Sequence, residues 1–198
     1  MKILFAVSDR DLLHSYSRLL ELDGADVCSS FDGTQTITLI ESHKFDVAVI
    51  GESLPRVENS RILGMLYGKG VPTIVISGKR VTSKMLCGSQ IACSYLPVPF
   101  LPEEMRSLIK TLLEKKQSGK VFRTGEVSID TSCFSMEGVR VTNEEIDVLR
   151  AVCEDTPINV RSESVYISAL NSKLGSLNKH SRIKYILGKG YRLVNNNG

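Results

Sequence analysis

Apolar runs of strand length alternate with segments of helical period along the first part of this 198-residue chain. In the helical segments, apolar residues recur at intervals of three and four, as at Leu12, Leu13 and Tyr16. The strand-like runs are residues 2–7, 25–28, 45–50, 72–77 and 94–98. Strands that alternate with helices predict a parallel sheet covered on both faces. We therefore expect an α/β domain over residues 1–116, a doubly wound parallel sheet built from five strand–helix (βα) units.

The pattern changes after a short polar stretch, KKQSGK, and we expect a linker at residues 117–121. Strand-length runs separated by turn residues then predict a small antiparallel sheet. Thr142 and Glu145 have the spacing of a capping box, and Ile146, Leu149, Val152 and Cys153 form the apolar stripe of the helix that follows. Residues 122–198 are thus expected to form a second, small α+β domain.

Charge is distributed unevenly, although composition is ordinary for a soluble globular protein at 42% hydrophobic and 24% charged residues. The formal net charge is +3, but residues 161–198 alone hold seven Lys or Arg against one Glu. A basic end of this kind is a candidate surface for phosphates. The alternative is a solvated, lysine-rich face.

Several classes of function lack support in the sequence. The apolar start KILFAV is too short for a signal peptide or a membrane span, so we expect a cytoplasmic protein with no membrane partner. The cysteines, Cys28, Cys87, Cys93, Cys133 and Cys153, show no metal-ligand spacing and are expected to be reduced and packed. No glycine-rich nucleotide loop follows any strand, so no cofactor is predicted.

Residues 1–116 resemble the CheY-like receiver domain of bacterial response regulators. The stretch FDVAVIGESLP is similar to the third strand and following loop of that family, PTIVISG to its fourth strand, and YLPVPF to its fifth. In open α/β sheets the functional crevice lies beyond the carboxyl ends of the strands. The resemblance therefore implies a site at Val7–Asp9, Gly51–Glu52, Ser77–Gly78 and Val98–Pro99.

The chemistry that the resemblance implies is missing. Receivers accept a phosphoryl group on an aspartate with help from Mg²⁺ and a lysine, which requires a carboxylate, a hard cation and a positive charge. Here the phospho-acceptor position is Gly51, the acidic pair falls on Val7 and Ser8, and the lysine position is Val98. Ser77 alone retains the family's hydroxyl. Asp9 is expected to cap the first helix, and Glu52 to point away from residue 51 if the pleat continues. A phosphoryl-transfer enzyme is thus disfavoured.

A receiver-like domain that is not phosphorylated could still serve to form a homodimer. Receivers of the OmpR/PhoB type pair through their fourth helix, fifth strand and fifth helix. The resemblance implies an interface that contains Tyr95, Met105, Leu108 and Leu112. Leu108 stands where the family usually has arginine, and its exposure would favour an apolar, permanent contact. The alternative is that Leu108 packs inward.

The second domain resembles the winged helix-turn-helix of the same family. GVRVTNEEIDVL is similar to the entry to its first helix, VYISALNSKLG to its recognition helix, and RIKYILGKGYRLV to its terminal hairpin, or wing. Ile167, Leu170 and Leu174 match the buried positions. The segment EDTPINV is too short for the family's positioning helix and transactivation loop.

The candidate DNA contacts come from the recognition helix and from the wing. Ala169 is expected on the outward face of the recognition helix. Asn171 could read adenine, and Lys189 could enter a minor groove. Ile183, Ile186 and Leu193 are expected in the core and are not candidates. The candidates are Arg161, Ser164, Val165, Ser168, Asn171, Ser172 and Lys173 in the helix, and Lys179, Arg182, Lys184, Lys189, Tyr191 and Arg192 around the wing.

Two functions remain open at this point. We expect a DNA-binding regulator of transcription that works as a homodimer on double-stranded DNA, associated with the nucleoid and independent of aspartyl phosphorylation. The alternative is a protein-interaction module whose trimmed winged helix binds RNA polymerase or another regulator in place of DNA. The neutral recognition helix favours the second interpretation, and the basic end favours the first.

Overall fold

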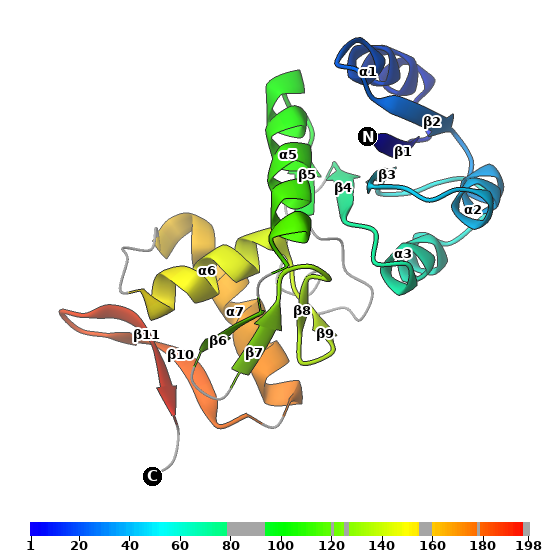
Figure 1. Cartoon of the computed structure of the whole chain (residues 1–198). Coiled ribbons are helices and arrows are strands. Elements are labelled where there is room, and N and C mark those ends of the chain that lie inside the picture. The colour runs from blue at the N-terminus through cyan, green and yellow to red at the C-terminus, as the bar shows by residue number, and fades with distance from the viewer. Residues whose placement is uncertain (79–93, 120, 125–126, 155–159, 178, 196–198) are drawn as a thin grey trace. The chain divides into compact units, whose positions relative to one another are not determined.

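The structure, a computed structural model, describes residues 1–78, 94–119, 121–124, 127–154, 160–177 and 179–195. The chain divides into two compact units, with the boundary between them at Gln117 and Ser118 (Figure 1). The first unit holds the strands and helices of the predicted α/β domain, and each unit is described by itself below.

The first unit is built on a parallel sheet with the strand order β2-β1-β3-β4-β5. Its strands are β1 (Lys2–Ala6), β2 (Asp26–Ser30), β3 (Val47–Gly51), β4 (Thr73–Ser77) and β5 (Ser94–Pro97). Each coincides with a strand-like run of the sequence to within two or three residues, so the predicted doubly wound sheet is confirmed.

Helices cover both faces of this sheet. They are α1 (Arg10–Leu22), α2 (Gly33–Ser42), α3 (Asn59–Gly68) and α5 (Pro102–Ser118). In Figure 1, α1 and α5 lie on one face and α2 and α3 on the other. Arg106 of α5 holds Asp23, just after α1, through two hydrogen bonds of 2.6 and 3.2 Å. On the opposite face, Leu4 and Ile50 pack with Ile40, Ile62 and Leu66 in a fully buried apolar cluster.

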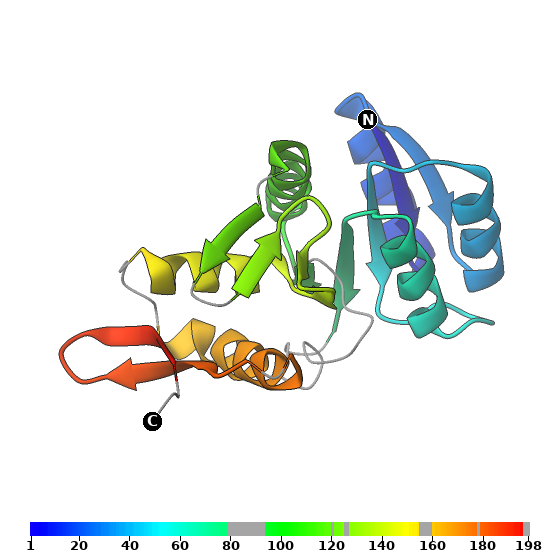
Figure 2. The ribbon, with the colours of Figure 1, turned by 60° about the horizontal axis from the view of Figure 1, so that its bottom comes forward.

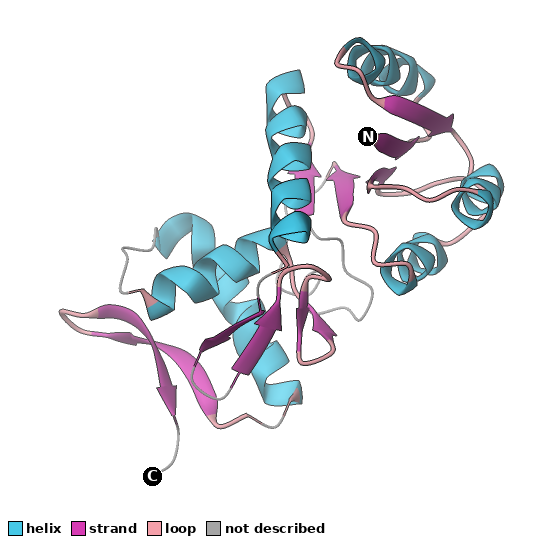
Figure 3. Cartoon of the chain, viewed as in Figure 1, coloured by secondary structure: helices cyan, strands magenta, loops and turns pink. Residues whose placement is uncertain are grey.

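The second unit combines a small sheet, two helices and a hairpin, as Figures 2 and 3 show. The antiparallel sheet runs in the order β6 (Val121–Thr124), β7 (Val127–Asp130), β8 (Ser135–Met136) and β9 (Val139–Arg140). The helices are α6 (Asn143–Cys153) and α7 (Val160–Ser176), and the hairpin pairs β10 (Ser181–Ile186) with β11 (Gly190–Asn195). The helices pack on each other and on the hairpin. This arrangement fits the predicted winged-helix domain.

Local sequence signals determine where these helices begin. The Thr142 hydroxyl accepts the Glu145 amide at 3.2 Å, and the Glu145 carboxylate accepts the Thr142 amide at 2.7 Å, so the predicted capping box is confirmed. The Asp9 carboxylate accepts the amides of Asp11 and Leu12, which confirms Asp9 as the N-cap of α1.

The boundary between the two units falls at Gln117 and Ser118, inside the predicted linker at 117–121, although α5 continues through Ser118 and β6 begins at Val121. Two predictions about the second half were wrong. Cys153 is exposed at the end of α6 instead of continuing its apolar stripe. Ile186 is exposed near the hairpin turn, whereas Ile183 is buried as expected. The EDTPINV segment contains residues 155–159, which lie outside the described residues.

The expectations about the cysteines and about membrane spans can be compared with the described residues alone. Among the described residues, Cys28, Cys133 and Cys153 form no disulfide, and burial raises the pKa of Cys28 and of Cys133. Cys87 and Cys93 lie outside the described residues. Within the described part of the chain, no helix combines the length and the apolar character needed to cross a membrane.

Candidate functional site

At the carboxyl edge of the first sheet, Val7, Gly51 and Val98 stand where the receiver resemblance implies two acidic residues and a lysine. Gly51 ends β3 beside Val7, and a Cβ added at residue 51 would lie 3.4 Å from both Cα and Cγ1 of Val7. The backbone amide of Val98 donates to the Ser77 carbonyl at 3.0 Å, while the Val98 side chain is 47% exposed. Among the described residues, no group of three His, Cys, Asp or Glu side chains could hold a metal ion.

One carboxylate nevertheless lies at this edge, and sequence reasoning missed it. The Glu52 Oε2 accepts hydrogen bonds from the Ser77 hydroxyl and from the Gly78 amide, both at 2.9 Å. The pleat argument, which directed Glu52 away, does not apply because β3 ends at Gly51. The signal that could have found this contact is the register of two adjacent parallel strands, which requires the sheet order to be known.

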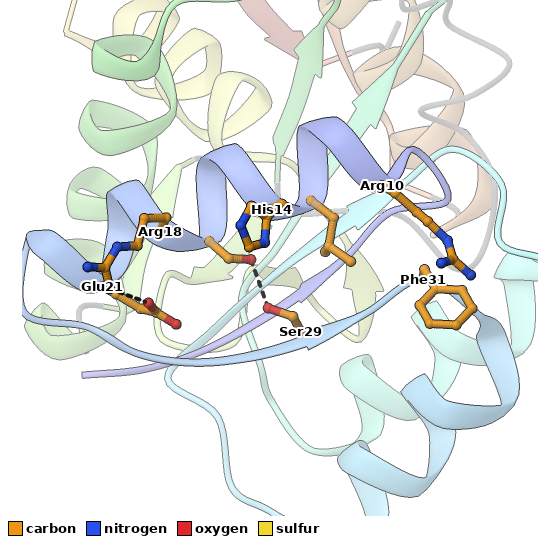
Figure 4. A pocket seen from close by; sticks show the side chains of 8 residues that line it. Arg10, His14, Arg18, Glu21, Ser29 and Phe31 are labelled. Atoms are coloured by element: carbon orange, nitrogen blue, oxygen red, sulfur yellow. Dashed lines mark hydrogen bonds and ion pairs between the residues drawn. The ribbon is translucent and has the colours of Figure 1, made fainter.

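A hollow of about 420 Å³ lies between α1 and β2. Figure 4 shows the side chains that line it. The guanidinium of Arg10 stacks 4.3 Å above the ring of Phe31, and Arg18 pairs with Glu21 at 3.5 Å. The hydroxyls of Ser17 and Ser29 share a hydrogen bond of 2.7 Å. These groups contact one another, and we assign them to the packing of α1 on the sheet.

In the second unit, α7 presents small hydroxyl side chains to solvent. Ser164, Ser168, Ser172 and Ser176 are all exposed and follow one another at intervals of four residues, so they share one face of the helix. The Ser172 hydroxyl donates to the Ser168 carbonyl at 3.2 Å. This stripe carries no formal charge.

The opposite face of α7 forms the core of the unit. Ile167, Leu170 and Leu174 are buried, which confirms the positions taken from the winged-helix resemblance. Ala169 was expected to point outward and is fully buried. Val165 is half-buried, and the side chain of Arg161 lies outside the described residues.

Asn171 was expected to contact DNA, and its amide is instead used within the chain. Its Nδ2 donates to the Ile183 carbonyl at 2.9 Å, and its Oδ1 accepts the Ile183 amide at 2.8 Å. This pair of hydrogen bonds ties α7 to β10. Both ends of the amide are thus engaged within the chain, which argues against a base contact by Asn171.

Lys173 was also expected to face DNA and is 3% exposed. Its Nζ donates to both carboxylate oxygens of the fully buried Glu145, at 2.8 and 2.6 Å. Burial raises the pKa of Glu145, while the charge and hydrogen bonds of Lys173 oppose that rise. Lys173 therefore connects α7 to α6 and offers no phosphate contact.

The register of the hairpin gathers three cations on one face. Arg182, Lys184 and Arg192 lie on the same side of β10 and β11, with Lys184 directly opposite Arg192. Arg182 donates to the carbonyls of Lys179 and Ser181, and Arg192 donates to the carbonyl of Tyr191. The other face carries Ile183 and, closer to the turn, the edge-to-face pair of Tyr185 and Tyr191.

Lys179, at the start of the hairpin, pairs with Glu137 at 2.9 Å. The hydrogen bond from Lys179 lowers the pKa of Glu137. An acidic group thus lies beside one of the predicted phosphate contacts.

The turn of the hairpin exposes an apolar side chain that sequence reasoning did not single out. Leu187 is 90% exposed, next to the exposed Lys189. Gly188 and Gly190 have φ values of +76° and +73°, a conformation that disfavours side chains with a Cβ. Leu187 and Lys189 therefore stand at the end of a hairpin whose shape depends on the two glycines.

The predicted dimer residues divide into two groups. Met105 and Leu112 are fully buried in the core of the first unit, so their assignment to an interface was wrong. Tyr95 and Leu108 are half-buried. Along α5, the buried positions Met105, Ile109 and Leu112 have the helical period, which fixes the face that packs on the sheet.

Comparisons with known proteins bear on both units. No family model matches the chain. The response regulator MprA of Mycobacterium tuberculosis is 29% identical over 118 residues, which is 58% of this chain and 51% of MprA. This chain thus spans about half the length of that relative. A probable transcriptional regulator, ycf29 of Porphyra purpurea, is 25% identical over 92% of this chain and 93% of its own. The response regulator ArlR of Staphylococcus saprophyticus is 23% identical over 96% and 97%.

Solved structures share the same architecture. A point mutant of RitR matches with a TM-score of 0.68 over 98% of both chains at 18% identity. The receiver domain of the Francisella response regulator 1452 matches with a TM-score of 0.53 and 26% identity, over 57% of this chain and 96% of its own. Relatives of this chain are therefore named as response regulators and as a probable transcriptional regulator, and its first unit has the CheY-like receiver fold.

Proposed function

We propose that the chain is a DNA-binding regulator of transcription that acts as a homodimer without aspartyl phosphorylation. The observation that carries the proposal is the cationic hairpin face of Arg182, Lys184 and Arg192 in the same unit as α7. Relatives along the full length of the chain include a probable transcriptional regulator. No catalytic role is proposed for any residue.

The proposed DNA contacts are a revised set. Ser164, Ser168 and Ser172 of α7 would meet base edges, because small hydroxyls donate and accept hydrogen bonds in a major groove. The hairpin would bind the backbone, since phosphate contacts position a protein on the duplex. The proposed hairpin contacts are Arg182, Lys184, Lys189 and Arg192, with Lys179 and Arg161 at the ends of the surface. Asn171 and Lys173 no longer belong to it, and Tyr191 lies on the other face of the hairpin.

Independence from phosphorylation follows from the chemistry of the strand ends. An aspartyl phosphate requires a carboxylate nucleophile and a cation, whereas position 51 is a glycine packed on Val7. The nearby carboxylate of Asp9 already caps α1. A second copy would pair through Tyr95 and Leu108, and the dimer would read half-sites about one helical turn apart.

A protein-interaction module is the second candidate, favoured by the uncharged serine stripe of α7. Such a module would bind RNA polymerase or another regulator through that stripe.

A selection experiment separates the two functions. The full chain is incubated with a pool of random double-stranded DNA at low salt, and retained molecules are sequenced. A regulator should enrich a two-part motif, and its binding should weaken with salt by a log–log slope of about −0.9 per phosphate contact. A chain that retains no DNA at low salt but captures purified RNA polymerase would support the interaction module.

A further inference from the structure

We propose that the amino edge of the first sheet holds a binding site for a small aromatic carboxylate. The site is a hollow of about 530 Å³ between the ends of α2, α3 and α5, a size typical of small-molecule sites. It lies where β3 and β4 begin, at the opposite edge of the sheet from Gly51 and Ser77. The proposal concerns the first unit alone and does not depend on DNA binding.

The floor of this hollow is apolar. Ile40 of α2 and Leu66 of α3 are fully buried, and Phe45 and Val71, which precede β3 and β4, are 6% and 4% exposed. The centroids of the Phe45 and His43 rings are 6.1 Å apart, and the ring planes are tilted by 39°. Tilted and offset arrangements are the ones that aromatic rings favour, so a ligand ring can pack beside this pair. Contact with the floor would also remove the apolar body of a ligand from water.

Three lysines line the same hollow, namely Lys44, Lys69 and Lys116. Nζ of Lys69 donates to the Ile40 carbonyl, and Nζ of Lys116 donates to the Asp46 carbonyl at 3.5 Å. Each ammonium group has three donor hydrogens, so these two backbone bonds leave further donors for a ligand. Among the residues that the structure describes, no ion pair joins any of the three lysines to a carboxylate.

The ends of the helices bring these cations together. Lys69 is the C-cap of α3, Lys44 follows the C-cap of α2, and Lys116 lies in the last turn of α5. A lysine at the C-terminal end of a helix is favoured by the helix dipole and by the carbonyls left without partners. That role explains each lysine by itself but does not require an apolar hollow between the three.

The lining of the hollow has a net positive charge. Asp46 also lines it, and the Asp46 carboxylate accepts the backbone amide of Lys2 at 2.7 Å. Three lysines and one aspartate give a formal charge of +2 when His43 is neutral. An anionic ligand complements this charge, and its hydrogen bonds to the ammonium groups would be charge-assisted. An apolar floor surrounded by cations therefore fits a molecule that has both a ring and a carboxylate.

The test uses the full chain labelled with ¹⁵N, titrated in turn with benzoate, phenylacetate and indole-3-acetate at constant ionic strength. At least one of these acids should produce saturable shifts of the amides of residues 43–46 and 69–71, and should raise the midpoint of thermal unfolding. The amide of the same acid has the ring without the charge and should bind about tenfold more weakly. Acetate has the charge without the ring and should give no saturable response.

Substitutions in the hollow test the part played by its lysines. Lys69→Met and Lys44→Met each remove one ammonium group and keep an apolar chain, and each should weaken binding of the responding acid about tenfold. Within the described residues, Lys44 forms no hydrogen bond or ion pair, so Lys44→Met serves if Lys69→Met does not fold. Lys110→Met, at a lysine of α5 that pairs with Glu114 outside the hollow, should bind like the wild type.

Three results would overturn the proposal. The first is the lack of a saturable response to all three acids. The second is a set of amide shifts confined to residues outside the hollow. The third is an affinity for the responding acid that is the same in Lys44→Met as in the wild type.

Discussion

Two polar residues of α7, Asn171 and Lys173, show which side-chain environments a sequence pattern cannot predict. The winged-helix resemblance placed Ile167, Leu170 and Leu174 at buried positions, and they are buried, as expected for apolar side chains. Asn171 and Lys173 are polar, and the same resemblance suggested exposure. Their partners, Ile183 and Glu145, lie 12 and 28 residues away, so the contacts depend on tertiary distances that no local pattern contains.

The buried pair of Lys173 and Glu145 predicts a large effect on stability. Lys173→Met should lower the free energy of unfolding of the second unit by about 3–5 kcal/mol, because it leaves a buried charge unpaired. Lys184→Met, at an exposed position, should change it by about 0.5 kcal/mol or less. Denaturant unfolding measures both values. Adding Glu145→Gln to Lys173→Met should recover much of the loss, and no recovery would contradict the role given to the charge.

Tyr166 predicts a pH dependence in the alkaline range. Burial, followed by the charges of Glu144 and Glu145, raises the pKa of Tyr166 from 10.0 to about 12. The folded state thus favours the neutral phenol, and the stability due to this preference is complete below pH 10 and is lost between pH 10 and about 12. Over that interval the unfolding midpoint of the wild type should fall more steeply than that of Tyr166→Phe. Parallel curves for the two proteins would contradict the prediction.

At the scale of elements, strands and helices could be predicted wherever one period dominated. Apolar runs of strand length identified the five strands of the first unit. The residue pairing of β10 and β11 puts Arg182 and Lys184 on one face of the hairpin. Ile186 was misjudged because a strand pattern does not tell where packing ends. Figure 2 shows the turn of the hairpin extending beyond the end of α7, and Ile186, close to that turn, is 37% exposed.

Substitutions in the hairpin should separate the contribution of charge to DNA affinity from that of an apolar contact. Lys184→Ala should reduce the magnitude of the log–log salt slope by about 0.9, because one phosphate contact is lost. Leu187→Ala should lower affinity without changing the slope, since exposed apolar side chains can wedge between base steps but release no counterions. Lys110→Ala, on α5 of the first unit, is the control and should change neither quantity. Binding isotherms at several salt concentrations measure all three variants.

At the scale of the whole molecule, the order of the two folds was predictable, whereas the extent of α5 was not. Two sets of matched motifs gave a receiver-like unit followed by a winged-helix unit. The polar stretch KKQSGK looked like a linker, but lysine and glutamine are good helix formers, and α5 continues through this stretch as far as Ser118. Composition alone could not tell an exposed helical turn from a flexible connection.

If the chain pairs through Leu108, a charge at Leu108 should disrupt the dimer, whereas a charge at Leu22 should not. Leu108→Asp should convert the dimer to a monomer in sedimentation at micromolar concentration, because a charge would be buried at the proposed interface. DNA affinity should fall with it, since two linked half-sites bind more tightly than one. Leu22→Asp, at a leucine that is 74% exposed at the end of α1, should remain dimeric. A monomeric wild type would refute the proposed pairing.

The contact between Glu52 and the end of β4 has a consequence for regulation over time. A phosphoryl group on a protein is added by one enzyme and lost by hydrolysis, so its lifetime sets the duration of a signal. A glutamate is made by the ribosome and stays until the chain is degraded. A regulator that carries its anion in this way would be controlled through its synthesis and degradation, and its copy number would be the signal.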